Sequence, residues 1–233
     1  FKQKTAYEIS TRDWSSDVCS SDLFVDGVHL TAHAPVDVAA IGADFYACSP
    51  YKFLGPHLGA LAAAPELLET LNPDKLLPST NQVPEKFELG TLPYEMLIGV
   101  SAAVDYLADL VPSQGTRRER VLHSMTALEE YEDTLHARLR TGLKDVPGIA
   151  LYSNATRRTP TETFTIDGVE SAEVSRRLAE KGVNAPASNF YALECSRWLG
   201  LGDAGGVRVG LAPYSSNDDV DRLIAGLMEI AAG

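Results

Sequence analysis

Short apolar segments alternate with helical ones in the first half of the chain, and glycine, proline or polar residues bound each of them. Phe24-Val25, followed by Asp26-Gly27, is typical of a short buried strand that ends in a turn. The runs over 44–49 and 58–64 predict two more strands, and Pro65 stands at the favoured first turn of a short helix. Strands that alternate with helices indicate an α/β layer whose sheet is largely parallel, and a mixed sheet is also compatible with the pattern.

The second half of the chain combines long amphipathic helices with isolated strands, which predicts a small α+β domain. Apolar residues recur at helical spacing in two long segments, and strand-like runs follow them. Ser171 is the expected N-cap of a further helix, and Asn217 or Asp218 is that of the last one. The expected elements are helices over 94–110 and 119–143, strands over 149–152, 161–166 and 206–212, and a final helix over 220–231.

Residues 1–23 show neither the helical nor the alternating pattern. The run from Lys2 to Glu8 and the run from Arg12 to Leu23 resemble the conceptual translation of a short-read sequencing adapter. We therefore expect a non-native leader that takes no part in the fold, with a natural disordered tail as the alternative. We also expect that the natural coding sequence was cut upstream of Phe24. The domains predicted on this basis are 24–110 and 111–233.

The charge and the cysteine content exclude several classes of function. A formal net charge of -12 would repel both nucleic acid and anionic membranes, so we expect neither as a partner. No apolar run approaches the roughly 20 residues that a transmembrane helix needs. Cys19, Cys48 and Cys195 match neither a disulfide framework nor a metal-binding spacing. We therefore expect no metal site and a reducing, cytoplasmic setting.

Two of the predicted strands lead into polar residues that could share a cleft. Asp26 follows the first strand and Lys52 lies just after the second, and open α/β sheets bind ligands at the carboxyl ends of their strands. A lysine that forms an imine needs a neutral fraction, which burial or nearby positive charge provides. A buried carboxylate can keep the ring nitrogen of pyridoxal phosphate protonated, so that the ring acts as an electron sink. Spacing alone favours the simpler interpretation of a surface lysine and an unrelated strand-end aspartate.

Five short blocks follow one another along the chain: Val25–His29, His33–Val38, Gly42–Phe45, Ser49–Lys52 with Gly55-Pro56, and Phe87–Thr91. Through them, residues 24 to about 110 resemble the class V aminotransferase family, and specifically its cysteine-desulfurase-like branch. The resemblance implies a fold-type-I enzyme that uses pyridoxal 5'-phosphate and acts on an amino acid, as a transferase or a lyase. It implies that 24–110 is the C-terminal part of the cofactor-binding large domain of this α/β fold. Residues 111–233 would then form the small C-terminal α+β domain.

The resemblance implies a role for each residue around Asp26 and Lys52. Lys52 matches the lysine that holds the cofactor as a Schiff base, and Asp26 matches the partner of the pyridine nitrogen. His29 falls where relatives bond the phenolic oxygen of the ring, and as a histidine it could also move protons. Alternatively, His29 is simply satisfied by its own loop. Ser49 resembles a hydroxyl that positions the phosphate or the lysine, and Tyr51 stands where many relatives have histidine.

Three positions further along the chain also match the family. Thr91 resembles the threonine that reaches the cofactor phosphate of the opposite subunit in a homodimer, and Gly90 allows close backbone approach. Capping a loop is the alternative role for Thr91. Arg208, in a segment that resembles the C-terminal strand of the family, matches the arginine that binds the substrate's α-carboxylate in a bidentate fork. A structural salt bridge is the alternative for Arg208.

The cysteine that carries sulfur in cysteine desulfurases has no evident counterpart. Tyr191 falls at its position, Cys195 lies in the start of an expected helix, and Cys48 is expected to be inert packing on a strand. The resemblance therefore implies a cysteine-desulfurase-like enzyme without persulfide transfer. A class V aminotransferase, an epimerase, another pyridoxal-phosphate lyase or a non-catalytic scaffold of the same fold is the alternative. Because the family's phosphate-binding turn precedes Asp26, we expect the chain as given to bind the cofactor poorly and to be inactive.

Overall fold

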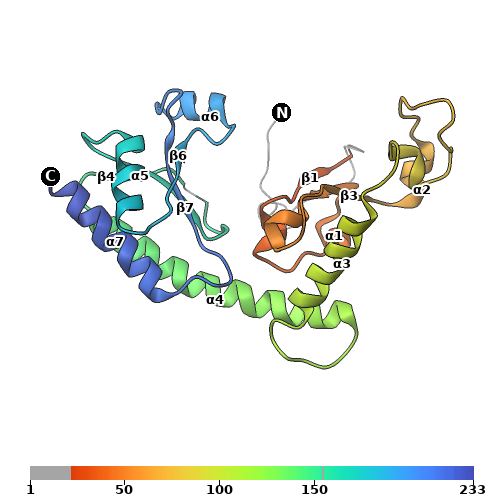
Figure 1. Ribbon diagram of the computed structural model, residues 1–233, viewed down its shortest axis with the longest axis horizontal. Coiled ribbons are helices and arrows are strands. Elements are labelled where there is room, and N and C mark those ends of the chain that lie inside the picture. The colour runs from red at the N-terminus through yellow and green to blue at the C-terminus, as the bar shows by residue number, and fades with distance from the viewer. Residues whose placement is uncertain (1–21, 154) are drawn as a thin grey trace, which may run out of the picture. The chain divides into compact units, whose positions relative to one another are not determined.

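The computed structural model describes residues 22–153 and 155–233 (Figure 1). The expected leader over 1–23 therefore lies outside the described residues except for its last two positions, and so does Cys19. The chain divides into two compact units between Ala127 and Leu128, inside the long helix α4 (Arg117–Asp145). The domain limits expected from the sequence, 24–110 and 111–233, stay a prediction.

A small mixed sheet of β1 (Phe24–Asp26), β2 (Phe45–Cys48) and β3 (Ala60–Ala63) organises the first unit. β1 runs parallel to β2, and β2 pairs with β3 in the antiparallel direction. Parallel neighbours need a crossover connection, which η1 (Leu30–Ala32) and α1 (Val38–Ile41) provide here (Figure 1). The three predicted strands are thus confirmed, and of the two compatible arrangements the sheet adopts the mixed one.

The first unit continues with further helical segments, among which are the two helices predicted to begin at Pro65 and to span 94–110. α3 (Tyr94–Ala108) buries Ala103, Leu107 and Ala108 on one side, as the helical spacing of its apolar residues predicted. Other apolar residues in its N-terminal half, including Leu97 and Ile98, are exposed. The remaining helical segments of this unit are η2 (Pro50–Phe53), α2 (Pro65–Thr70) and η3 (Glu85–Phe87).

Helix α4 carries the apolar stripe that its sequence predicted. Met125, Leu128 and Leu139 on this stripe are buried. Tyr131 is partly exposed, and its hydroxyl donates a hydrogen bond to the carbonyl of Ser215 at 2.6 Å. Among residues 22–153 and 155–233, no helix is both long enough and apolar enough to cross a membrane.

Four strands form an antiparallel sheet in the second unit, in the order β4-β5-β7-β6. They are β4 (Ile149–Leu151), β5 (Thr161–Ile166), β6 (Ala187–Ser188) and β7 (Gly206–Gly210). The expected strands are confirmed within one or two residues. β6 was not expected, because a strand of two residues leaves no alternating pattern in the sequence.

Helices α5 (Ser171–Glu180) and α7 (Asn217–Ala231) pack with the end of α4 against this sheet (Figure 1). One continuous apolar core results, and fully buried side chains from every layer contribute to it. Burying each large apolar side chain contributes about 1.5–3 kcal/mol, so this core is the main source of stability in the unit. Core residues with no exposed surface are Leu139, Leu143, Phe164, Val174, Leu178, Val207 and Leu227.

A buried carboxylate stands among the apolar residues of β5. Glu162 shares the inward face of the strand with Phe164 and has no exposed surface. Its Oε1 lies 2.7 Å from Nε2 of His136, 3.0 Å from Arg140 and 3.5 Å from Arg158. Burial opposes the charge, but these three cationic or polarisable partners outweigh it and hold the pKa of Glu162 below its usual value. The carboxylate is therefore ionised in the folded unit at neutral pH.

The N-cap predicted for α5 is wrong. The helix begins at Ser171 itself, and Glu170 occupies the N-cap position without a side-chain cap bond. The Ser171 hydroxyl instead donates to the carbonyl of Gly205 at 3.3 Å. Serine competes for several kinds of backbone partner near helix ends, so its presence fixes the end only to within a residue.

The N-cap predicted for α7 is also wrong, by one or two residues. Ser216 caps this helix, rather than Asn217 or Asp218. The Ser216 hydroxyl accepts from the backbone N–H of Asp219, and the Asp219 carboxylate accepts from the backbone N–H of Ser216. This reciprocal pair is a capping box, and the spacing Ser-x-x-Asp in the sequence carries its signal.

Candidate functional site

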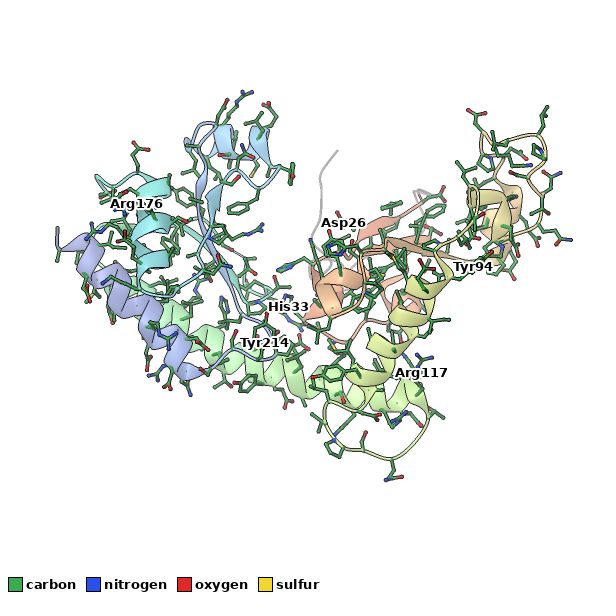
Figure 2. The ribbon with its side chains drawn as sticks, viewed as in Figure 1. Asp26, His33, Tyr94, Arg117, Arg176 and Tyr214 are labelled. Atoms are coloured by element: carbon green, nitrogen blue, oxygen red, sulfur yellow. The ribbon has the colours of Figure 1, made fainter. Side chains whose placement is uncertain are left out.

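The carboxyl ends of β1 and β2 bring two of the expected site residues to the same edge of the first sheet. Asp26 is the last residue of β1 (Figure 2) and lies opposite Ala47 of β2. The Gly27 N–H donates to the Ala47 carbonyl at 2.8 Å and extends this register by one residue. Because β2 ends at Cys48, the chain turns into Ser49 and the Lys52 segment at this same edge.

The turn after Asp26 is held by contacts that fix the carboxylate. Asp26 Oδ1 accepts a hydrogen bond from the Val28 N–H at 3.0 Å. The Thr31 hydroxyl donates to the Gly27 carbonyl at 2.7 Å and lies 2.9 Å from the hydroxyl of Tyr46. A Cβ at Gly27 would come within 2.0 Å of the Tyr46 ring, so only glycine fits there. The sequence predicted no role for Thr31 or Tyr46.

The neutral hydroxyl of Tyr46 supports this turn through its contact with Thr31. Its side chain is buried on β2, and burial raises its pKa although the bond with Thr31 lowers it. A buried, protonated phenol needs a polar partner, and Thr31 supplies one. The sequence predicted a strand over 44–49, but it could not predict the hydroxyl contact of Tyr46.

Lys52 lies on η2, one turn beyond the end of β2. Its backbone N–H donates to the Ser49 carbonyl at 3.0 Å, and its side chain is exposed. The Lys52 ammonium lies 6.0 Å from the centre of the Tyr51 ring, and that ring stacks on His57 with centroids 5.1 Å apart. Ser49 is 9% exposed, and its side chain makes no capping bond to η2. Within the described residues, no ion pair joins Lys52 to Asp26.

His29 is exposed and stands at the N-cap of η1, in the same turn as Asp26. Its ring meets that of His33 edge to face, with centroids 4.7 Å apart. His33 is almost fully buried. His29 therefore belongs to the same sheet edge as Asp26, and its contact with a neighbouring ring leaves both of its expected roles open.

Gly90 and Thr91 lie between η3 and α3, away from the strand ends. Gly90 has a φ of +73°, a conformation that favours glycine. A Cβ at this position would meet nothing within 4 Å, so the backbone angle explains the glycine better than close packing does. The Thr91 side chain is exposed. In the part of the chain that the structure describes, no hydrogen bond or ion pair joins either residue to Asp26 or Lys52.

Arg208 is found in the second unit, on β7, and its guanidinium lies over the ring of Phe190 at 3.8 Å from the centroid. Among the described residues no carboxylate forms an ion pair with it, which argues against the alternative of a structural salt bridge. Partial burial lowers the pKa of Arg208 from its usual value, and an arginine stays charged nonetheless. The sequence predicted no role for Phe190.

The two described cysteines differ in environment. Cys48 is half-buried on β2, and burial raises the pKa of its thiol, which lowers its reactivity. Cys195 is exposed in α6 (Leu193–Trp198), as its expected helical setting predicted. Tyr191 is fully exposed in the turn before α6. Across the described residues, no group of three or more histidine, cysteine or acidic side chains could hold a metal ion.

Comparison with known proteins gives a consistent result. The family model described as aminotransferase class-V matches residues 20–223. A cysteine desulfurase from Klebsiella pneumoniae is 32% identical over 221 residues, which cover 89% of this chain and 50% of that protein. The aminotransferase-like protein FGM3 from Gibberella zeae is 32% identical over 218 residues, or 88% of this chain and 50% of that protein. The chain thus spans about half the length of these relatives.

Solved structures agree with the sequence comparison. The cysteine desulfurase CsdA from Escherichia coli has a TM-score of 0.74 at 28% identity, and the match covers 91% of this chain and 51% of that one. A cysteine desulfurase from Thermococcus onnurineus has a TM-score of 0.79 at 23% identity, over 91% of this chain and 53% of that one. These matches confirm the predicted fold class, an α/β arrangement of the fold-type-I kind followed by a small α+β part.

Proposed function

The chain belongs to the class-V aminotransferase family, and from this premise we propose that it carries the cofactor lysine of a pyridoxal-phosphate-dependent enzyme acting on an amino acid. One observation carries the proposal. The parallel register of β1 and β2 brings Asp26 and the segment from Ser49 to Lys52 to the same sheet edge, where open α/β sheets bind ligands.

The side chains at this edge carry the functional groups that would bind the aldehyde, the ring nitrogen and the phosphate of pyridoxal 5'-phosphate. Lys52 offers the amine that would hold the aldehyde, Asp26 offers a carboxylate for the pyridine nitrogen, and Ser49 offers a hydroxyl for the phosphate or for the lysine. Tyr51 lies beside Lys52 and would line the same site. When bound, this cofactor supplies an electron sink for bonds at the α-carbon of an amino acid.

Asp26 holds a proton at the ring nitrogen in the proposed site. The hydrogen bond from the Val28 N–H to Oδ1 fixes the carboxylate at the end of β1. The support from Thr31 and Tyr46 keeps the turn in this geometry, so Asp26 needs little reorganisation when the ring is bound. His29, in the same turn, would bond the phenolic oxygen and hold or move a proton there.

Arg208 binds the α-carboxylate of the substrate in this proposal. Within residues 22–153 and 155–233 the planar guanidinium of Arg208 has no carboxylate partner, so it can offer two parallel N–H donors. We further propose a cysteine-desulfurase-like reaction without persulfide transfer, because the family resemblance assigns the position of the sulfur-carrying cysteine to Tyr191. Cys195 lies in a helix, and the half-buried Cys48 has a raised pKa.

The proposed enzyme is a cytoplasmic homodimer. Thr91 is exposed and follows the left-handed turn at Gly90, which suits a hydroxyl that reaches the cofactor phosphate of a second copy. The cytoplasmic setting rests on the two free thiols of the described chain, which suit a reducing compartment.

Borohydride reduction after incubation with excess pyridoxal 5'-phosphate tests the assignment of Lys52. Because the chain as given is expected to bind the cofactor poorly, the overall yield should be low, but the predominant pyridoxyl-modified peptide in the mass spectrum should contain Lys52. Lys52→Arg keeps the positive charge but removes the reactive amine, so this peptide should disappear. Asp26→Ala should lower the yield at Lys52, because the bound ring loses the partner of its nitrogen.

Lys144→Arg is the matched control, because Lys144 is also an exposed lysine but lies on α4. It should leave the yield at Lys52 unchanged. Labelling that spreads equally over the exposed lysines, and that Asp26→Ala does not alter, would contradict the proposed site.

A further inference from the structure

Two consecutive residues after β6 adopt a backbone conformation that L-residues rarely use. Phe190 has a φ of +53° and Tyr191 a φ of +65°, and neither is glycine. Such angles cost free energy and persist only where surrounding contacts impose them. A pair of them in one turn therefore calls for a structural or functional reason.

Side-chain and backbone contacts impose this turn. The Ser188 hydroxyl accepts from the Phe190 N–H at 3.1 Å, and the Asn189 carbonyl oxygen of the side chain accepts from the Tyr191 N–H at 3.1 Å. The Asn189 amide donates to the carbonyl of Asp203 at 3.0 Å. A Cβ at Gly205 would lie 2.0 Å from the Ser188 carbonyl oxygen, so the backbones on the two sides approach too closely for any other residue.

The turn changes what Phe190 can reach. β6 pairs with β7 so that Ser188 lies opposite Gly206. If β6 continued as a strand, Phe190 would lie opposite Ala204, four residues from Arg208 and roughly 13 Å away along the strand. The left-handed turn instead brings the Phe190 ring to 3.8 Å from the Arg208 guanidinium.

The contact leaves the arginine ready for a planar partner. The ring occupies one face of the guanidinium, and none of the described residues forms an ion pair with it. An arginine stacked on a ring keeps its edge donors free, and carboxylates are bound at that edge through two parallel hydrogen bonds. The same stacking limits the rotamers of a long side chain that would otherwise lose entropy on binding.

We propose that Phe190 is a positioning residue. Its strained turn stacks the Phe190 ring on the Arg208 guanidinium, and the N–H donors at the edge of the guanidinium stay available for the α-carboxylate of the amino-acid substrate. This inference rests on the proposed function, in which Arg208 is the carboxylate-binding residue. It adds a residue that acts through Arg208 and that does not itself touch the substrate carboxylate.

Nuclear magnetic resonance of the arginine side chains in the full chain tests the positioning. The Hε signal of Arg208, assigned by its disappearance in Arg208→Lys, should be shifted upfield because it lies over an aromatic face. Phe190→Leu keeps an apolar side chain at the same backbone angle and should return the signal to the range of exposed arginines. Tyr191→Leu makes the matched change one residue later in the turn, where the side chain is fully exposed, and should leave the signal in place.

Titration with sodium acetate, compared with sodium chloride at equal ionic strength, tests the carboxylate. We expect acetate to move the Arg208 signal beyond the effect of chloride, and Phe190→Leu to weaken the apparent affinity about two- to fivefold, as loss of an exposed cation–π contact would. Wild-type protein that responds to acetate no more than to chloride would overturn the role of Arg208 in the proposed function. An unchanged signal and affinity in Phe190→Leu, or equal losses in Tyr191→Leu, would overturn the positioning role alone.

Discussion

The two units of the chain bury their apolar residues to different degrees, although their described parts are of nearly equal length. In the described part of the chain, sixteen of the 25 buried apolar residues lie in the second unit, after Ala127, and nine lie in the first. The exposed large apolar side chains are distributed in the opposite way, thirteen in the first unit and five in the second. Only the second unit therefore has a core in proportion to its size.

The exposed apolar residues of the first unit gather on β3, on the segment before α3 and on the N-terminal half of α3. A fold is stable by a small difference between large terms, so the unit with the smaller core should open more readily. Asp26 and Lys52 therefore stand on the unit with the smaller apolar core, and Arg208 stands on the unit with the larger one. The exposed apolar residues on these segments of the first unit are Leu61, Leu76, Leu77, Phe87, Leu89, Tyr94, Met96, Leu97 and Ile98.

The largest expected effect comes from truncating one leucine in each unit. Leu178 on α5 has no exposed surface, whereas Leu61 on β3 is 56% exposed. Leu178→Ala should lower the free energy of unfolding of the second unit by about 2–5 kcal/mol, because it removes buried methyl groups and leaves a cavity. Leu61→Ala should change the free energy of unfolding of the first unit by less than about 0.5 kcal/mol. Urea titration followed by far-ultraviolet circular dichroism measures both free energies. Equal losses would contradict the inference that the two units differ in how much their buried apolar residues stabilise them.

The next largest effect concerns the buried charge of the second unit. Glu162→Gln removes the ionic partner of His136, Arg140 and Arg158, and at pH 7 it should lower the free energy of unfolding by about 2 kcal/mol. The pKa of Glu162 is lowered in the folded state, so its contribution is complete above the unfolded pKa of about 4.3. It is lost as the pH falls through the folded pKa. The difference between wild type and Glu162→Gln should therefore shrink in urea titrations below about pH 4.

Glu173→Gln is the control for this pH dependence. Glu173 on α5 also has a lowered pKa, because Arg176 bonds to it, but both side chains are exposed to water. Solvent screens such pairs, so its substitution should have a much smaller effect than that of Glu162. A difference between wild type and Glu162→Gln that is as large at pH 3 as at pH 7 would contradict the role of the ionised carboxylate.

Much of the fold could be predicted from the sequence, because periodicity reports burial directly. The strand at β5 alternates strictly, and the stripes of α3 and α4 follow helical spacing, so these elements are where the sequence predicted them. β6 has two residues, and its position depends on pairing with β7, which is a long-range contact. Long-range pairing leaves no local pattern, and the same reason accounts for the unpredicted pairing direction of β3.

The candidate site could be predicted only in part. Asp26 and Lys52 were expected at one sheet edge because each follows a strand, and the parallel register of β1 and β2 brings their segments together. The supporting contact of Tyr46 with Thr31 and the stacking of Phe190 on Arg208 could not be predicted in this way. Both depend on side chains that meet across turns, and neither residue type is diagnostic of such a contact. The chemical roles of the site residues stay predictions.

The smallest expected effect uses the same substitution of a helix cap in each unit. Ser216 caps α7 and Asp37 caps α1, where its Oδ1 accepts from the Ala40 N–H at 3.0 Å. Ser216→Ala should lower the free energy of unfolding of the second unit by about 1 kcal/mol, because backbone N–H groups at the start of the helix lose their partner. Ser216→Thr keeps the hydroxyl and should restore most of the loss.

Asp37→Ala should leave that transition unchanged and should speed hydrogen exchange only near the Ala40 amide, since α1 has four residues and no buried side chain. Scanning calorimetry and native-state hydrogen exchange on the full chain measure these outcomes. Equal shifts of the main transition by Ser216→Ala and Asp37→Ala would mean that both units unfold together. Unequal burial would then not give unequal stability, because the two units would unfold in one cooperative transition and would have the same free energy of unfolding.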